Sequence, residues 1–320
     1  MVAMVIGLLL LAGISQVFLS NKQTYRLLEA QSHVQENGRF AFEFLARDVR
    51  MADFWGCQVN TDNITDHLCH TDSTHINYCS SGVGISSGSY AYDWQSDGIF
   101  GTDGATSNDP DTLILRGAFD SGIFVEQVPA TPAAALKVTD TSGLVKGDLV
   151  LVTDCQMGEF FSVTDTTGPS GFDNIGHNTG TNGGFIQNKT QVFNKKYGPD
   201  ASVYKFGRVE YYIGTGMGGE PALFRRYNVL SPTTGDEIVS GIENMQIEYG
   251  VDTGANGNVD YYEDATEVTN QGAWDNVVSV RITLTARSPE RYVVTSTTGG
   301  ADRRLRREFT STMAVRNRLN

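Results

Sequence analysis

Oxygen-bearing side chains recur at regular spacing in one short stretch, DTGANGNVDYYE, from Asp252 to Glu263. Counted from Asp252, oxygens fall at positions one, five, seven, nine and twelve, where position seven supplies a main-chain carbonyl and Gly257 stands at position six. Hard oxygen ligands at this spacing wrap a calcium ion, and glycine at position six permits the sharp turn. The candidate Ca²⁺ ligands are Asp252, Asn256, Asn258, Asp260 and Glu263.

The same stretch has a second interpretation. Gly254 occupies position three, which normally holds Asp or Asn in a calcium loop. The flanking residues, QIEYGV and EVTNQG, look like strand and loop rather than the two helices of an EF-hand. A plain β-hairpin that turns at Asn256 and Gly257 therefore competes with the calcium site.

Four cysteines, at positions 57, 69, 79 and 155, allow three complete pairings. Disulfides are the default in an oxidising compartment. A metal cluster is the alternative, because histidines and cysteines crowd into thirteen residues, although their spacing fits no standard zinc pattern well. Its members would be His67, Cys69, His70, His75 and Cys79.

Other patterns argue against an enzyme. GTGMGG at Gly214–Gly219 follows a strand pattern, but EPALFRRY after it indicates another strand rather than the helix that a nucleotide phosphate needs. The sequence has no HExxH or P-loop pattern, and no nucleophile, base and metal converge. NIT at Asn63 and NKT at Asn188 match the weak glycosylation acceptor pattern.

The element that must position these features begins the chain. Residues 1–20 contain no Asp, Glu, Lys, Arg or Pro, and Lys22 is the first charge. An amphipathic helical pattern then follows without a break, and the first proline is Pro110. A helix to about Asp53 would be roughly 80 Å long. Its apolar ridge is Leu27, Ala30, Val34, Ala41, Leu45, Val49 and Ala52.

The apolar run predicts a membrane anchor rather than a cleaved signal. No basic residue precedes it, and it leads into a helix rather than a cleavage motif. An anchor needs roughly 20 apolar residues, so the run falls slightly short unless residues precede Met1.

The remainder predicts an α+β protein with two parts, a helix at 1–53 and an extracytoplasmic, β-rich head at 54–320. Residues 57–109 indicate a long connecting region with short strands near Ile76–Tyr78, and 166–184 a surface loop. Predicted strands are Thr112–Arg116, Phe124–Val128, Leu149–Thr153, Phe160–Thr164, Tyr204–Ile213, Leu223–Tyr227, Met245–Tyr249, Val277–Thr285 and Phe309–Val315.

The net charge of −13 argues against a nucleic-acid partner. The C-terminal segment is the exception, with seven Arg against three acids from Glu290 to Asn320. These arginines either lie on a solvated strand or turn, or form an edge that docks an acidic neighbouring subunit. The four in question are Arg303, Arg304, Arg306 and Arg307.

The N-terminal stretch from MVAMVIGLLLLAGISQVFLS to FWGC resembles the first helix of type IV minor pilins of the PilW family. PDTLILRGA at Pro110–Ala118, GDLVLVTDC at Gly147–Cys155 and EFTSTMAVRNRLN at Glu308–Asn320 resemble the family further downstream. Family members carry a leader, a cleavage site and an acidic residue upstream of where Met1 stands, so we expect a truncated or mis-started N terminus.

The resemblance implies a pilin-like fold and a structural, non-enzymatic function. The protein would prime pilus assembly or sit at the pilus tip. Its partners would be other minor pilins and the major pilin, contacted through its helix, and a PilY-type tip protein. It would be held in the bacterial inner membrane, head in the periplasm, before assembly. Cys57 and Cys155 lie in segments that resemble the family, which implies the pairs Cys57–Cys155 and Cys69–Cys79.

Two alternatives remain open. One is a calcium-dependent binding or adhesion module carried by a pilin helix, with Ca²⁺ as the only candidate cofactor. The other is a pseudopilin of a type II secretion system, from which the PilW-like C-terminal stretch would distinguish the protein.

Overall fold

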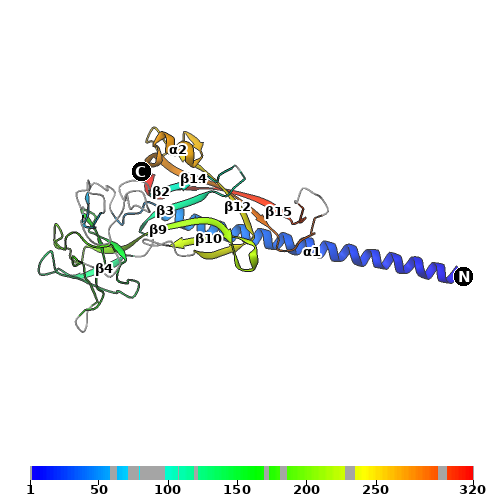
Figure 1. The fold of residues 1–320 in the computed structure, drawn as a ribbon, viewed down its shortest axis with the longest axis horizontal. Helices are drawn as coiled ribbons and strands as arrows, with labels where there is room; N and C mark the ends of the chain where they lie inside the picture. Colours follow the sequence, from blue (N-terminus) through cyan, green and yellow to red (C-terminus); the bar gives the residue numbers. More distant parts are fainter. Residues whose placement is uncertain are drawn as a thin grey trace.

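A computed structural model describes residues 2–57, 63–70, 79, 98–106, 108–118, 122–168, 173–180, 186–227, 235–294 and 301–319. A helix of 50 residues, α1 (Val2–Met51), precedes all the strands. The helix projects from one end of a β-rich head, so that the N terminus lies far from the head (Figure 1). A long helix followed by mostly antiparallel sheets confirms the predicted α+β, pilin-like class.

The larger sheet has eleven strands within the described residues and is organised around β9 (Ser202–Thr215). The first half of β9 pairs with β6 (Leu149–Thr153) and β4 (Ile123–Gln127), and the second half with β3 (Thr112–Ala118) and β10 (Pro221–Tyr227). One long strand therefore runs through both ends of the head. The other strands are β1 (Ile64–Asp66), β2 (Ile99–Thr102), β5 (Leu136–Val138), β7 (Gly158–Ser162), β8 (Asp173–Ile175) and β11 (Asp236–Ser240).

The smaller sheet is antiparallel, in the order β13–β12–β14–β15. Its centre follows the predicted alternation: Val280, Ile282 and Leu284 are fully buried, whereas Arg281 and Thr283 on the other face are half-buried. Such alternation is typical of an antiparallel strand with one covered face. The four strands are β12 (Ile242–Val251), β13 (Tyr261–Glu263), β14 (Val277–Arg287) and β15 (Arg306–Ala314).

A short helix, α2 (Ala265–Gln271), stands where the sequence indicated a loop. Asp264 caps its start by accepting a hydrogen bond from the Glu267 amide, and Gly272 ends it in the left-handed conformation. An N-cap Asp with Glu three residues later is a recognised start signal, so the helix was readable from the sequence. The described residues also contain three single-turn helices: η2 (Met217–Gly219), η3 (Trp274–Asn276) and η5 (Arg316–Arg318).

The second half of α1 is part of the main core. Most of the predicted ridge is at most 1% exposed and packs between the two sheets, whereas Leu27 is 39% exposed because the head begins only beyond it. The ridge prediction is wrong for Leu27 alone. The buried ridge residues are Ala30, Val34, Ala41, Leu45, Val49 and Ala52.

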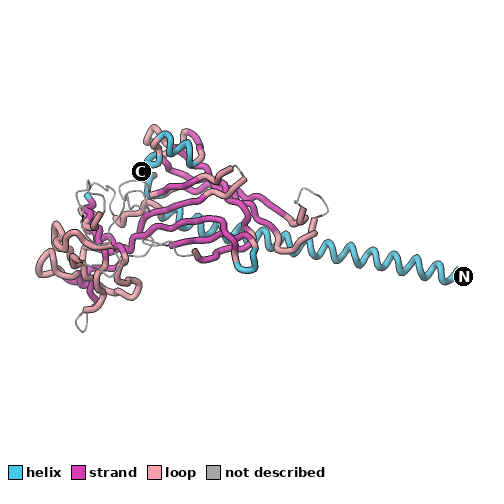
Figure 2. Tube along the Cα trace, in the orientation of Figure 1, coloured by secondary structure: helices cyan, strands magenta, loops and turns pink. Residues whose placement is uncertain are grey.

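The end of the head around β4 has its own cores, built from β1 and β4–β8 with the first half of β9. Loops are concentrated here, at the end away from the N terminus (Figure 2). We call residues 122–201 the distal module, and β1 and the first half of β9 pack against it. It joins the rest of the head through β9, which carries buried side chains into the cores of both parts.

All nine strands predicted from the sequence are present, with ends shifted by a few residues. Others were missed: 57–109 contains β1 and β2, and the supposed loop at 166–184 contains β8. A strand of three residues, such as β8, is too short to show alternation and exists because β5 pairs with it. The predicted strands near Ile76–Tyr78 lie outside the described residues.

Candidate functional site: the projecting helix and its anchor in the head

The first half of α1 is uncovered. Its described side chains from Met4 to Glu29 are exposed apart from the half-buried Gly7. Eleven large apolar side chains are 53–81% exposed, and each would gain about 1.5–3 kcal/mol on leaving water. This segment therefore requires an apolar environment. The eleven are Met4, Val5, Ile6, Leu8, Leu9, Leu10, Leu11, Ile14, Val17, Phe18 and Leu19.

Within the described residues, α1 is the one helix long and apolar enough to cross a membrane. Its most apolar window has a mean hydropathy of 1.9 and no buried residue. This criterion uses length and composition only, and a signal sequence near the N terminus can also meet it. The difference here is continuity, because the same helix passes into the core of the head.

Close contacts at Asn37 and Gly38 fix the position of the head along the axis of α1. The Asn37 side-chain amide donates a hydrogen bond of 2.9 Å to the Ser240 carbonyl at the end of β11. One residue later, a Cβ added at Gly38 would lie 2.8 Å from the ring of Phe309. Glycine at this position therefore lets β15 approach the helix closely.

A polar triad fixes the rotation of the helix. Asp48 is only 5% exposed, and one oxygen of its carboxylate accepts hydrogen bonds of 2.7 Å from the Tyr211 hydroxyl and from Nε of Arg225. Burial and the negative charge of Asp48 raise the pKa of the Tyr211 phenol, so the phenol stays a donor. The sequence analysis missed this group, although Asp48 is an acid on the apolar face of the helix, which is a signal for a buried partner.

The C-terminal segment holds the end of α1. Asn317 donates hydrogen bonds of 2.8 Å and 3.3 Å to the carbonyls of Ala52 and Arg50, which have no partner within the helix. Arg318 Nε lies 2.6 Å from the carboxylate of Asp53, whose φ of 60° turns the chain out of the helix. The last residues of the chain therefore act as the C-terminal cap of the first element.

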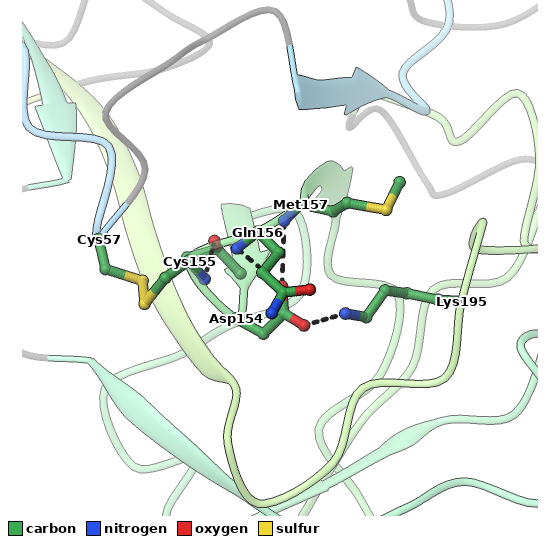
Figure 3. Close-up of a disulfide and its surroundings, with 7 residues drawn as sticks. Cys57, Asp154, Cys155, Gln156, Met157 and Lys195 are labelled. Atoms are coloured by element: carbon green, nitrogen blue, oxygen red, sulfur yellow. Dashed lines mark hydrogen bonds and ion pairs between the residues drawn. A yellow bond between two sulfur atoms is a disulfide. The ribbon is translucent and has the colours of Figure 1, made fainter.

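A disulfide then joins the helix end to the distal module. Cys57 is bonded to Cys155 in the β6–β7 turn, across a sequence separation of 98 (Figure 3). The carboxylate of the adjacent Asp154 accepts the amides of Gln156 and Met157 and pairs with Lys195. The second disulfide is Cys69–Cys79. The structure thus contains the two pairs that the family resemblance implied.

Residues 210–317 match the family model PilW, described as type IV pilus-assembly protein W. The match supports a PilW-type pilus protein. It covers the end of β9, β10–β15 and Asn317, which caps α1, and we call it the PilW-like region. An apolar helix on a pilus-assembly component is compatible with membrane association. No curated protein and no solved structure matches the chain.

The PilW-like region contains the predicted calcium loop, which connects β12 to β13 as an antiparallel hairpin. The turn spans several residues rather than two, with positive φ at Ala255 (50°) and Gly257 (77°). The candidate ligands hold the loop themselves. Asp252 accepts the amides of Gly254 and Gly257 at 3.0 Å and 2.6 Å.

The other candidate ligands are engaged in the same way. Asp260 accepts hydrogen bonds from the amide and hydroxyl of Thr253, which lower its pKa, and Glu263 accepts one from Gln271 of α2. Asn256 accepts the amide of Asn258. No three His, Cys, Asp or Glu side chains of the described ranges lie close enough together to hold a metal ion. Calcium binding stays a prediction from the sequence.

The histidine and cysteine cluster is divided among other contacts. Cys69 and Cys79 form a disulfide, His70 lies 2.6 Å from Asp66, and His67 is hydrogen-bonded to the fully buried Glu159. His75 lies outside the described residues.

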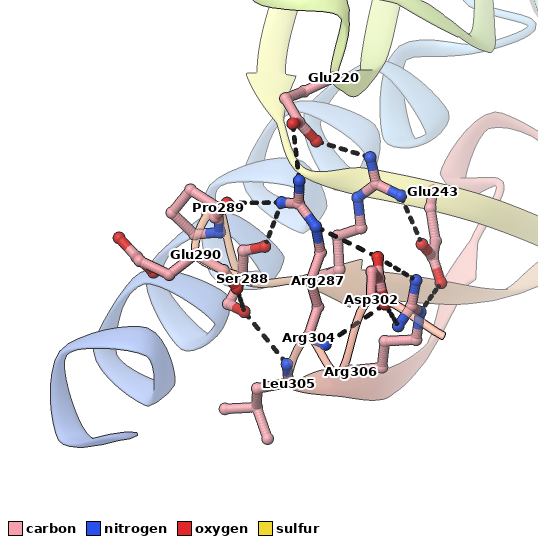
Figure 4. A network of polar contacts seen from close by, with 10 residues as sticks. All are labelled: Glu220, Glu243, Arg287, Ser288, Pro289, Glu290, Asp302, Arg304, Leu305 and Arg306. Atoms are coloured by element: carbon pink, nitrogen blue, oxygen red, sulfur yellow. Dashed lines mark hydrogen bonds and ion pairs between the residues drawn. The ribbon is translucent and has the colours of Figure 1, made fainter. Parts of the chain in front are cut away.

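Two of the four C-terminal arginines, Arg304 and Arg306, differ from both interpretations drawn from the sequence. Arg304 is 3% exposed and pairs with Glu220 at 2.8 Å and Asp302 at 3.2 Å, while Arg306 pairs with Asp302 and Glu243 (Figure 4). Arg304 and Arg306 therefore brace the β14–β15 hairpin internally rather than lying on a solvated or docking edge. Asp302 is a neighbour in the sequence, but the partners Glu220 and Glu243 are 84 and 63 residues away, so no local pattern indicates this role. Arg303 and Arg307 are exposed.

Two weak motifs have structural roles. GTGMGG forms the turn between β9 and β10, with Met217 89% exposed, so the predicted strand after it is confirmed. Asn188 is 2% exposed and exchanges hydrogen bonds with the backbone of Ser162, so it is not an accessible glycan acceptor. Asn63 is exposed.

Proposed function

We propose that the protein is a minor pilin that primes type IV pilus assembly and sits at the pilus tip with other minor pilins and a PilY-type tip protein. The observation that carries this proposal is the division of one helix into an uncovered apolar half and a half that fills the core of the head. The PilW-type match adds involvement in pilus assembly.

The division of α1 suits a subunit that changes surroundings. In a bilayer, residues 4–20 would be covered by lipid, and in a filament they would be covered by the helices of other subunits. Both environments are apolar, so the transfer between them costs little for such side chains. The head moves with the helix as one body because Asp48, Asn317 and the Cys57–Cys155 disulfide hold it.

The size of the head favours few copies. Two sheets and a distal module are bulky beside a single helix, which is poorly suited to close tiling along a thin filament (Figure 1). A subunit at the tip has no neighbour above it and escapes this restriction. The distal module, at the end away from the helix, would then be free for the tip protein.

The test uses the full chain in a piliated host that lacks its own PilW-type gene. A charged residue near the middle of a membrane helix costs about 2.5–3.5 kcal/mol, so Leu9→Asp should abolish membrane retention or piliation, as should Val5→Asp. Gln23→Asp is the matched control, because residue 23 is also exposed but lies beyond the apolar run.

Normal piliation with Leu9→Asp would refute the proposal. Loss of secreted enzymes with intact pili would instead indicate a secretion pseudopilin.

A further inference from the structure

The end of the head from which α1 projects carries exposed basic side chains, although the whole chain has a net charge of −13. Two belong to the helix just after the apolar run, and three belong to the β14–β15 hairpin, which lies at that end of the head (Figure 1). We call them the basic rim. Its members are Lys22, Arg26, Arg291, Arg303 and Arg307.

These side chains differ from the paired arginines beside them. Ion pairs with Glu220, Glu243 and Asp302 engage the guanidinium groups of Arg287, Arg304 and Arg306 (Figure 4). The members of the basic rim form no ion pair with any described residue, and Arg307 only packs over the ring of Phe309. The exposed acids of the same segments are Glu29 and Glu308, with Glu290 half-buried. Asp302 is also half-buried but is paired with Arg304 and Arg306, so the rim is positive on balance.

The position of the basic rim along the axis of α1 follows from the contact between Gly38 and Phe309. Strand β15 and α1 run in the same direction away from the N terminus (Figure 1). At about 3.3 Å per strand residue and 1.5 Å per helix residue, Arg307 of β15 lies at about the level of helix residue 33, and Arg303 precedes the strand, nearer the tip of the hairpin. The apolar run ends at residue 20, so Lys22 lies about 3 Å and Arg26 about 9 Å beyond it along the helix axis. The polar headgroup layer of a bilayer extends over a similar depth.

Two exposed residues of the hairpin have a strained backbone conformation. Tyr292 and Arg303 have φ values of 59° and 48°, in the left-handed region that side chains other than glycine rarely adopt. The two residues face each other across the hairpin, because Tyr292 donates its amide to Asp302 and Val293 donates to Arg303. Tyr292 is 67% exposed, and tyrosine is enriched at membrane–water interfaces.

We propose that the basic rim binds the phosphates of anionic phospholipid headgroups and holds the head against the membrane surface while α1 is in the bilayer. The lipid-binding proposal rests on the proposed function, because it requires α1 to be inserted in the bilayer. Each basic side chain near an anionic surface changes the bound population by about fivefold. Entry into the filament would then require release from the lipid surface.

The test uses the full chain reconstituted into phosphatidylcholine vesicles with and without phosphatidylglycerol, each containing a dansyl-labelled headgroup lipid. A Tyr292→Trp substitution supplies the donor, and the same vesicles with the parent chain give the background. We expect stronger energy transfer in the anionic vesicles, and its loss on adding salt, which screens exposed charges.

The decisive variant is Arg291→Glu with Arg303→Glu and Arg307→Glu, made in the Tyr292→Trp chain. It should lower the transfer in anionic vesicles at least tenfold, to the value in neutral vesicles. The matched control is Lys146→Glu with Lys196→Glu and Arg316→Glu, which changes the net charge equally at exposed positions away from the hairpin and should leave the transfer unchanged. Equal thermal unfolding would show that both variants fold.

Equal transfer in neutral and anionic vesicles, with the protein inserted in both, would overturn the basic rim and leave the proposed function standing. Failure to insert into either vesicle would overturn the proposed function itself. If the rim variant instead lost copurifying minor pilins without any response to lipid charge, the rim would be a protein-docking edge and the lipid proposal would be wrong.

Discussion

The hydroxyl of Tyr211 donates a hydrogen bond of 2.7 Å to the carboxylate of Asp48, across a sequence separation of 163 residues. This contact joins the middle strand of the larger sheet to the helix that carries the apolar segment. Because Arg225 binds the same carboxylate oxygen, the buried charge is compensated and the helix cannot rotate without breaking both bonds. Three side chains therefore set the direction in which the head leaves the axis of α1.

Removing Asp48 should be costly. Asp48→Ala leaves Tyr211 and the partly buried Arg225 without their acceptor, and we expect a loss of about 3 kcal/mol in the free energy of unfolding. Tyr211→Phe removes one donor only and should cost about 1–1.5 kcal/mol. Urea denaturation of the full chain measures both. Glu43→Ala, on the exposed face of the same helix, is the control and should stay within about 0.5 kcal/mol. Equal effects of all three changes would contradict the triad.

Gly38 should tolerate no side chain. Alanine is normally favoured over glycine within a helix by about 1 kcal/mol, but a Cβ at this position meets the Phe309 ring. We expect Gly38→Ala to destabilise the head by about 1–3 kcal/mol through overpacking. Gly13→Ala is a matched change with nothing within 4 Å, and it should leave thermal unfolding of the head unchanged. A stabilised Gly38→Ala head would show that β15 does not press on the helix.

The two disulfides should contribute unequally. In the chain-entropy model, closing the long loop between Cys57 and Cys155 stabilises by about 5 kcal/mol, and closing the short one between Cys69 and Cys79 by about 3 kcal/mol. Paired Cys→Ser variants compared by denaturant unfolding give the order. A larger loss from the Cys69 and Cys79 variant would indicate that the long loop retains order when unfolded.

The β14–β15 hairpin should loosen in acid. Hydrogen bonds from Arg306 hold the pKa of Asp302 at about 2, below its ordinary value of 3.8. A lowered pKa means that the unfolded chain binds the proton first, so this stabilisation is complete above pH 4 and is lost as the pH falls towards 2. Hydrogen exchange of the hairpin amides should accelerate in that window for the native chain.

In Asp302→Asn the acceleration should be smaller, because Asp302 no longer titrates and only Glu220 and Glu243 remain as acids paired with the hairpin arginines. Glu308→Gln, an exposed change on the same hairpin, should keep the native acid response. An unchanged response in Asp302→Asn would assign the acid transition to another group.

Calcium binding by the Asp252–Glu263 loop can be tested by calorimetry on the full chain. The sequence hypothesis predicts saturable heat with Ca²⁺, a raised melting temperature, and loss of both in Asp260→Asn, which keeps the hydrogen-bonding shape. Absence of heat would show that the loop is a hairpin held by its own Asp252 and Asp260 hydrogen bonds. Mg²⁺ at the same concentration is the control for charge screening.

Periodicity made the helix and the longer strands predictable. The apolar run, the ridge from Ala30 to Ala52 and the alternation in β14 are local patterns, and a local pattern fixes which face of an element is covered. The strand β8 and helix α2 were missed for different reasons. Strand β8 is formed by pairing with β5, which no local pattern indicates. Helix α2, in contrast, begins with a local capping signal, Asp264 followed by Glu267.

The sequence by itself determined that one helix would be apolar at its start and amphipathic beyond, because side-chain polarity and spacing are properties of neighbouring residues. Only the tertiary structure decided where the head begins on that helix, leaving Leu27 exposed, and that Arg304 is buried beside Glu220 rather than solvated. Those outcomes depend on partners many residues away. Their positions are set by the folding of the sheets as a whole, and no local pattern carries that information.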